Sequence, residues 1–302
     1  MIYMKKKIKL IILAIIVLIN LFACNIININ DNFAYEVALD NYFNGEEVWI
    51  LQNQTIAQSL NAIIKTNNND LIIFDGGRKG DAEFLYKFIK RNGGKVSAWF
   101  LSHIHDDHVG AIYEIIENHK DIKIENLYYN FADFDYYYKF EGVDAGIVDI
   151  LLAAFGEAKS RGTIIHDDIK MKDMIEVDGV KVEVMNDLYL LDEDGPNNSS
   201  MVYKAYIGDK TMIVFGDLAY AGGEKILADR GVSLKSDIVV MAHHGRGGVG
   251  EEVYKAVAPE IVIWPTTEKI YNSDGGKVTR EWIEALNVKK EVLSCENTYV
   301  IK

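Results

Sequence analysis

The sequence predicts a single domain of the α+β class, and three observations lead to that prediction. Short apolar runs typical of strands alternate with segments whose apolar residues recur at helical spacing. Several of these runs end in polar residues of the kind that bind metal ions. No Pro/Gly-rich linker divides the 302 residues, and 49% of them are hydrophobic, so the chain can bury a sizeable core.

The first 24 residues resemble an export signal. Four lysines precede an apolar stretch, Leu10 to Ala23, that is short for a membrane span and typical of a signal peptide. The stretch ends in Leu21-Phe22-Ala23-Cys24, which resembles the lipobox of bacterial lipoproteins, with Cys24 as the lipidated residue. We expect an exported protein anchored to the membrane through Cys24; an uncleaved anchor and a secreted product are the alternatives. The expected organisation is a signal peptide (1–24), a polar tether (25–45) and one folded domain (46–302).

The charge of the chain argues against one class of partner. The formal net charge is −13, and loss of the four lysines in the signal would make it −17. Extended nucleic acid is bound through Lys and Arg that neutralise phosphates, so an acidic body disfavours it. A small ester held by metal ions stays compatible. Only Cys24 and Cys295 could form a disulfide, and lipid on Cys24 would exclude it.

Strands and helices follow one another along the whole domain. The Asp178-Gly179 and Gly208-Asp209 turns lie between apolar runs and predict two β-hairpins. The expected strands are 47–52, 62–65, 71–74, 96–101, 174–177, 180–185, 201–207, 211–215, 237–242, 261–264, 291–294 and 298–301. The expected helices are 81–91, 111–118, 146–159, 223–229, 251–257 and 279–286.

The run His103-Ile104-His105-Asp106-Asp107-His108 is the strongest chemical signal in the sequence. It directly follows an expected strand and holds three of the seven histidines. Alternate side chains share a side in extended backbone, so His103 and His105 can bind one metal, while Asp107 and His108 turn toward a second. Imidazole and carboxylate suit Zn²⁺ and also Mn²⁺ or Fe. Two such ions can share and activate a hydroxide for hydrolysis. The alternative is a surface cluster without metal.

This run resembles the His-x-His-x-Asp-His signature of the metallo-β-lactamase superfamily. The resemblance is closer to the ComEC-like branch, the metallo-hydrolase domain found in DNA-uptake proteins, and it covers most of residues 46–302. The other matching segments are Asp75-Gly76-Gly77, Asn197-Asn198-Ser199-Ser200, Phe215-Gly216-Asp217-Leu218 and His243-His244-Gly245. The resemblance implies a four-layer αββα sandwich with two divalent metal ions, Zn²⁺ or Mn²⁺, at the edge of two sheets.

The resemblance also implies a ligand set. His103 and His105 would bind the first metal, and Asp217 would bridge both ions. Asp107 and His244 would be the catalytic residues, with His244 as a proton donor beside the site, although which of His243 and His244 ligates is left open. The second metal would be bound by Asp107, His108 and His243. Asp75 would orient a ligand imidazole, or else serve only as a turn former.

One segment departs from the superfamily pattern. Many members supply a further histidine to the first metal before the second hairpin, where this chain has residues 197–200 without histidine. The first metal would then keep an open position for substrate. Asn198 or Ser199 could bind that substrate, or could merely help a loop enter a strand. His166 is expected in a solvated loop and His119 at a helix C-terminus.

An aromatic stretch follows the metal loop, in the region where the superfamily places substrate-contacting insertions. Packing of an irregular lid explains it, and cation–π recognition of a choline-bearing phosphodiester or another envelope component is the sharper hypothesis. The residues are Tyr128, Tyr129, Phe131, Phe134, Tyr136, Tyr137, Tyr138 and Phe140.

The expected function is an exported, dinuclear metal-dependent hydrolase. Its substrate would be a small-molecule or envelope-derived phosphodiester or similar ester. The alternatives are a nuclease of the DNA-uptake type, a lactone or β-lactam hydrolase, and a non-catalytic binding module at the cell surface.

Overall fold

The computed structural model describes residues 33–302. The chain separates into two compact units, Met1–Ala34 and Tyr35–Lys302, and the second contains all the helices and strands described here. The expected signal peptide and the lipidation site Cys24 lie outside the described residues. Within the described residues, no helix has both the length and the hydropathy that a membrane crossing requires.

Two mixed sheets form the centre of the second unit. The first has the strand order β1-β17-β2-β3-β4-β6-β8-β9 and the second the order β10-β11-β12-β13-β14-β15-β16, while β5 and β7 form a separate pair. The first sheet and the pair consist of β1 (Glu36–Leu39), β17 (Tyr299–Ile301), β2 (Glu47–Ile50), β3 (Asn61–Lys65), β4 (Leu71–Asp75), β6 (Ala98–Phe100), β8 (Asn126–Tyr128), β9 (Ile164–His166), β5 (Lys95–Val96) and β7 (Lys123–Ile124). The second consists of β10 (Met174–Val177), β11 (Val180–Val184), β12 (Tyr203–Ile207), β13 (Lys210–Val214), β14 (Ile238–Val240), β15 (Ile261–Trp264) and β16 (Lys290–Leu293).

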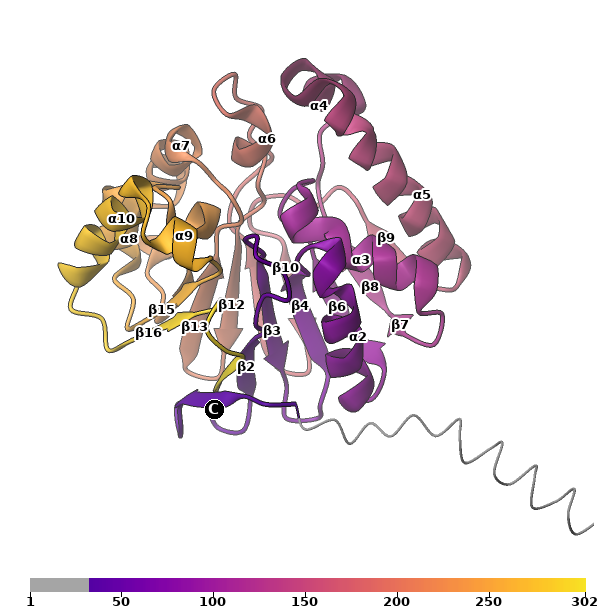
Figure 1. The fold of residues 1–302 in the computed structure, drawn as a ribbon, viewed down its shortest axis with the longest axis horizontal. Coiled ribbons are helices and arrows are strands. Elements are labelled where there is room, and N and C mark those ends of the chain that lie inside the picture. Colours follow the sequence, from indigo (N-terminus) through magenta and orange to yellow (C-terminus); the bar gives the residue numbers. More distant parts are fainter. Residues whose placement is uncertain (1–32) are drawn as a thin grey trace, which may run out of the picture. The chain divides into compact units, whose positions relative to one another are not determined.

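Helices cover the outer face of each sheet, and two further short helices lie at one end (Figure 1). On one side lie α2 (Ala82–Arg91), α3 (Asp106–Asn118) and α5 (Ile147–Ser160). On the other side lie α7 (Tyr220–Arg230), α8 (Glu251–Val257), α9 (Glu268–Tyr271) and α10 (Asp274–Glu284). The two short helices at the end are α4 (Phe134–Glu141) and α6 (Gly195–Asn198).

The main core lies between the two sheets. Its buried residues come from both, for example Ile72, Phe74 and Phe100 from the first sheet and Val182 and Val214 from the second. A second apolar cluster packs the outer face of the second sheet against α7, α8 and α10. These layers confirm the four-layer αββα sandwich and the α+β class that were expected from the sequence.

The folded domain begins earlier than the sequence indicates. Strand β1 lies inside the stretch 25–45 that was expected to be a tether, and it pairs in parallel with β17 through Glu36 and Tyr299. Only Ala38 of its four residues is buried, so the strand lacks the apolar alternation by which strands are recognised. Residues Glu36–Leu39 of the expected tether are therefore an edge strand of the first sheet.

Candidate metal centre

The predicted ligands follow three strand ends that meet at one place. His103 and His105 lie in the loop after β6, and Asp107 and His108 occupy the first turn of α3. Asp217 follows β13, and the His243-His244 pair follows β14. Residues at strand ends can converge at a common edge of layered sheets, and here the convergence is close.

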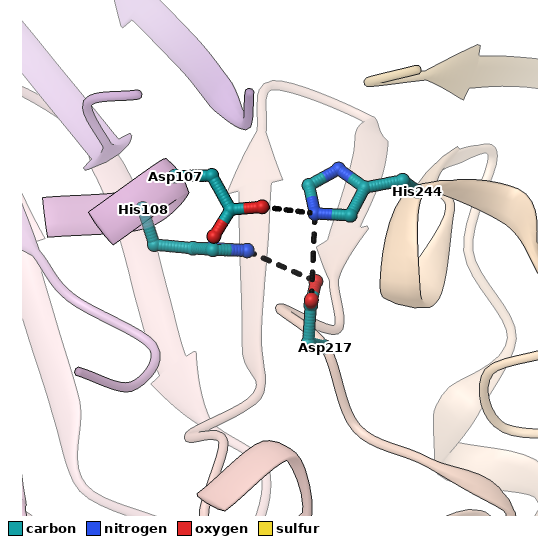
Figure 2. A group of neighbouring side chains, drawn as sticks. All are labelled: Asp107, His108, Asp217 and His244. Carbon is teal, nitrogen blue, oxygen red and sulfur yellow. Dashed lines mark ion pairs between the residues drawn. The ribbon is translucent and has the colours of Figure 1, made fainter. Parts of the chain in front are cut away.

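Two groups of side chains could each hold a metal ion, and Asp217 belongs to both. In each group the ligand atoms all lie within 4.8 Å of one another. Figure 2 shows the first group, in which the carboxylates of Asp107 and Asp217 face the ring nitrogens of His108 and His244. The second group consists of His103, His105 and Asp217, and is thus the three-residue set that the missing third histidine predicts.

Hydrogen bonds on the far side of His108 and His244 fix which ring nitrogen faces the group. Nδ1 of His108 lies 2.7 Å from Oδ2 of Asp75, and Nδ1 of His244 lies 2.6 Å from the carbonyl oxygen of Pro265. Both oxygens only accept, so each Nδ1 carries a proton and each neutral ring presents the lone pair of Nε2 inward. Nε2 of His108 then lies 3.0 Å from Oδ1 of Asp217, and Nε2 of His244 lies 3.2 Å from Oδ2 of Asp107.

The same reasoning applies to the second group. The hydroxyl of Ser102 donates to Oδ2 of Asp75 over 2.8 Å, so it accepts from Nδ1 of His103 over 3.0 Å. Nε2 of His105 lies 2.5 Å from a carboxylate oxygen of Glu141 and donates to it. The two remaining lone pairs, on Nε2 of His103 and Nδ1 of His105, face each other across 2.9 Å.

Acceptors that converge in a buried place require a cation between them. Nε2 of His108, Nε2 of His244 and Oδ1 of Asp217 are buried and have no hydrogen-bond partner of acceptable geometry. Such unpaired buried atoms are costly unless a metal or a proton joins them. Imidazole nitrogens with aspartate oxygens are the donor set of Zn²⁺ and related divalent ions, so the residues fit two such metals.

The pKa values of the four-residue group show that protons on the imidazoles can balance the charge of the two carboxylates. Burial lowers the pKa of His108 and of His244, but the neighbouring aspartates outweigh burial and raise both pKa values, that of His244 to about 9. Burial raises the pKa of Asp107 and of Asp217, and the imidazoles outweigh it and hold both pKa values below the ordinary range. Protons on the imidazoles thus stabilise the same carboxylates that a metal would neutralise.

Burial lowers the pKa of His103 well below its ordinary value, and the nearby rings of His108 and His105 lower it further. The ring therefore stays neutral at physiological pH. A neutral imidazole is the form that binds metal.

Asp75 has both of the roles that the sequence allowed. Its carboxylate also accepts from the backbone nitrogen of Ser102 over 2.7 Å, and its backbone has a φ of 54°, as a turn requires. The turn after it contacts the start of α3, since Gly76 N donates to the carbonyl of His108 over 2.8 Å. Asp75 therefore positions both the ring and the backbone of His108.

Arg78 is a supporting residue that the sequence did not indicate. Its guanidinium lies 3.4 Å from Asp107 and 3.2 Å from Asp106, and it donates to the carbonyl of Gln58 over 2.9 Å. Helix α3 can approach this segment because residue 110 is glycine, and a Cβ there would lie 2.4 Å from the backbone nitrogen of Lys79. Arg78 thus holds the carboxylate of Asp107 in place.

The structure exchanges the expected places of His243 and His244. His244 is fully buried and lies in the four-residue group, whereas Nε2 of His243 lies 3.9 Å from Oδ2 of Asp217 and its side chain is partly exposed. Both residues have positive φ angles, 50° and 58°, so the alternation of side chains expected after a strand does not apply. The geometry therefore makes His244 the candidate ligand and leaves His243 at the rim.

The structure gives Asn198 and Ser199 a structural role, because both side chains are fully buried and already paired, and Asn198 also lines the cavity that contains Arg246. The amide of Asn198 donates to the carbonyl of Glu193 and accepts from the backbone nitrogens of Ala219 and Gly222. The hydroxyl of Ser199 donates to the carbonyl of Pro196 over 2.6 Å. Both residues shape the loop that enters β12, which is the alternative the sequence left open.

The other two histidines lie in neither group. His166 belongs to β9 and not to a loop, and its ring stacks on Tyr128 with centroids 4.2 Å apart. His119 ends α3, as expected, and stacks on Tyr86.

The aromatic stretch forms α4 and its flanks instead of an irregular lid. Its rings contact one another, as in the pairs Tyr129–Phe131, Tyr136–Phe140 and Phe134–Tyr138, whose centroids are 4.6, 5.2 and 5.7 Å apart.

The fold and the site together define a class of protein: an αββα sandwich with a His-x-His-x-Asp-His loop after a strand and a candidate metal centre. The model of the metallo-beta-lactamase superfamily matches residues 57–293. The chain therefore belongs to the metallo-beta-lactamase superfamily. No curated protein matches it.

Solved structures of the same fold are similar at low sequence identity. The metallo-beta-lactamase fold protein YhfI from Bacillus subtilis is 11% identical with a TM-score of 0.53, covering 85% of this chain and 99% of that one. Zn²⁺-bound PqqB from Methylobacterium extorquens is 10% identical with a TM-score of 0.50, covering 85% and 99%. CmlA, a diiron β-hydroxylase from Streptomyces venezuelae, is 10% identical with a TM-score of 0.50, covering 85% of this chain and 54% of that one. These likenesses establish the fold alone.

Proposed function

We propose that the protein is a dinuclear metal-dependent hydrolase that acts on a phosphodiester or a similar ester. The observation that carries the proposal is the convergence of imidazole nitrogens and carboxylate oxygens in two groups that share Asp217. Bound divalent ions would supply Lewis-acid activation of water and would neutralise negative charge that develops in the ester. Zn²⁺ is the preferred metal for this donor set, with Mn²⁺ as the alternative.

Each of the two groups of residues would bind one metal ion. Asp107, His108 and His244 would hold one ion, His103 and His105 the other, and Asp217 both. The second group has only three protein ligands, which leaves room for a substrate oxygen. Burial lowers the pKa of His243, so that a neutral ring stands at the rim, where it can exchange a proton with the leaving group.

An anionic substrate is supported by the surroundings of His243. A cavity of about 270 Å³ is lined in part by Asp194, Tyr220 and Arg246, and the backbone nitrogen of Arg246 donates to the carbonyl of His243 over 3.1 Å. The guanidinium of Arg246 makes no ion pair with any residue between 33 and 302. An unpaired arginine beside a metal centre favours a phosphate or carboxylate group, which it can bind with two hydrogen bonds.

Matched assays test the proposal. Zinc-loaded residues 25–302 would be incubated with bis-p-nitrophenyl phosphate, phosphorylcholine, double-stranded DNA and nitrocefin, with Asp217→Asn as the inactive control. Turnover of the diester, lost in Asp217→Asn and showing a raised KM in Arg246→Met, supports the proposal. Turnover of nitrocefin alone would instead indicate a β-lactam hydrolase, and DNA cleavage a nuclease. If the protein bound no metal and turned over none of these substrates, it would instead be a binding module at the cell surface.

We further propose that the protein belongs to the ComEC-like branch and works outside the cell, anchored by lipid on Cys24. The motifs that support the branch are Asp75-Gly76-Gly77 and His243-His244-Gly245, in addition to the metal loop. The lipobox-like end of the signal supports the anchor. Labelled palmitate should enter the full chain and not the Cys24→Ala variant, and equal labelling of the two would refute the anchor.

A further inference from the structure

Helix α4 reaches the metal centre through one residue. Glu141 is its last residue, and one carboxylate oxygen lies 2.5 Å from Nε2 of His105. The two residues are 36 positions apart, and they lie on separate elements. Both side chains are mostly buried, at 19% and 26% exposed, so water only partly weakens the contact.

We propose that Glu141 is a positioning residue for His105 and thereby couples helix α4 to the second ligand group. The inference rests on the metal-binding part of the proposed function and does not depend on the substrate. By accepting the proton of Nε2, Glu141 keeps that proton off Nδ1 of His105, the nitrogen that faces His103. A carboxylate bonded to the outer nitrogen of a ligand imidazole also orients the ring and raises its basicity.

Glu141 can act in this way because α4 is fixed at several points. The helix begins with a capping hydrogen bond from the backbone nitrogen of Tyr136 to Asp133, 2.9 Å long. The hydroxyl of Tyr136 donates to the carbonyl of Leu191 over 3.0 Å, and that of Tyr137 lies 3.2 Å from the hydroxyl of Ser199. These contacts join α4 to the segment that carries α6.

Glycine at position 195 allows a close approach on the same side. A Cβ there would lie 2.6 Å from the ring of Phe140 and 2.8 Å from the hydroxyl of Tyr136. The residue after Glu141, Gly142, has a φ of 57° and ends the helix at once. The backbone before Glu141 is therefore fixed by the contact of Phe140 with Gly195, and the α-helix ends directly after Glu141.

Asp75 performs the corresponding task for the other group. Its carboxylate lies 2.7 Å from Nδ1 of His108, as that of Glu141 lies 2.5 Å from Nε2 of His105. Asp75 ends a core strand, however, whereas Glu141 ends a helix of the aromatic stretch. A displacement of α4 would therefore act directly on the second group and reach the first group only through the shared Asp217.

The experiment compares metal affinity, ring tautomer and stability in matched variants of the zinc-binding protein. Glu141→Ala removes the acceptor, Glu141→Gln keeps one neutral acceptor, and Asp135→Asn removes one exposed negative charge from the same helix. Competition with a chromophoric chelator should show one of the two zinc ions weakened about 10- to 100-fold in Glu141→Ala. The weakening should be smaller in Glu141→Gln and absent in Asp135→Asn.

Two further readouts separate positioning from a structural effect. Long-range ¹H–¹⁵N spectra should show the proton of His105 on Nε2 in the unaltered chain. In Glu141→Ala they should show a mixture of the two neutral tautomers. The visible spectrum of the cobalt-substituted protein should change in Glu141→Ala, while the far-UV circular dichroism of the metal-free form stays the same. Unchanged zinc affinity and unchanged tautomer in Glu141→Ala would overturn the inference, and so would equal effects of Glu141→Gln and Glu141→Ala. If the unaltered chain bound no zinc, the proposed function would fail, and the tautomer spectra would still test the role of Glu141.

Discussion

Replacement of Asp75 by asparagine should weaken metal binding without unfolding the protein. Three donors end on this buried carboxylate: Ser102 N at 2.7 Å, the Ser102 hydroxyl at 2.8 Å and Nδ1 of His108 at 2.7 Å. Asparagine has the same shape but only one acceptor atom. If its NH₂ group faces His108, it can only donate, so the proton of the ring moves to Nε2 and blocks the lone pair that binds metal.

The other orientation of the amide is also unfavourable. Its NH₂ group would then face the backbone N–H of Ser102, and two donors would oppose each other in a buried place. A hydrogen bond to a charged group contributes about 1.5–3 kcal/mol, and loss of such a partner typically weakens metal binding about 10- to 100-fold. That range corresponds to about 1.4–2.8 kcal/mol, so the two magnitudes agree.

Competition of zinc between the protein and a chromophoric chelator measures the effect. Asp237→Asn is the matched control, because Asp237 also accepts two 2.8 Å hydrogen bonds from Thr211 but precedes β14, whereas the histidine pair follows that strand. Asp237→Asn should lower the free energy of unfolding and leave the zinc affinity unchanged. If Asp75→Asn remained folded and bound zinc as tightly as the unaltered protein, the tautomer reasoning would be refuted.

Three other predictions concern the site and the fold. His244→Ala should lose one of two bound zinc ions by elemental analysis, whereas His243→Ala should keep both and lose turnover; the reverse result would restore the order expected from the sequence. Gly110→Ala should destabilise the protein by about 1–3 kcal/mol in urea unfolding, because its Cβ would lie 2.4 Å from a facing backbone nitrogen. Gly156→Ala, in open space on α5, should instead stabilise it by up to about 1 kcal/mol, and equal effects would contradict the packing argument. Zinc uptake at pH 7 should release protons, because His108 and His244 have raised pKa values without metal and must lose protons to bind it. Calorimetry in buffers of different ionisation enthalpy measures this release, which should diminish above pH 9, the approximate pKa of His244.

The parts of the fold that could be predicted are those with local signals. The Asp178-Gly179 turn marks the hairpin of β10 and β11, which the structure confirms with Val177 opposite Val180. Polar clusters after apolar strands indicate Asp75 and Asp217 as site residues from the sequence alone. These signals depend on neighbours in sequence, so a single chain reveals them.

The parts that could not be predicted depend on contacts distant in sequence. Strand β8 is only three residues long, and its place beside β6 is set by the sheet and not by a pattern in its own residues. Helix α4 was hidden because its aromatic residues are distributed around the helix, with Tyr137 buried and Tyr138 exposed. Glu141 could not be predicted either, because nothing near it in the sequence indicates that it contacts a histidine.

The two histidine motifs explain why sequence reasoning succeeded at one and failed at the other. His105 has extended backbone, with φ −63° and ψ 143°, and the ring nitrogens of His103 and His105 lie 2.9 Å apart, so the two side chains meet as the sequence predicts. His243 and His244 both have left-handed backbone, which costs about 1–3 kcal/mol for each such residue. The surroundings hold them there: His243 N donates to the carbonyl of Gly216 over 3.0 Å, and His244 Nδ1 donates to that of Pro265 over 2.6 Å. Adjacent identical side chains differ only in the direction that the backbone gives them. The strained turn therefore determines which of the two histidines faces the site, and the sequence His-His alone does not indicate it.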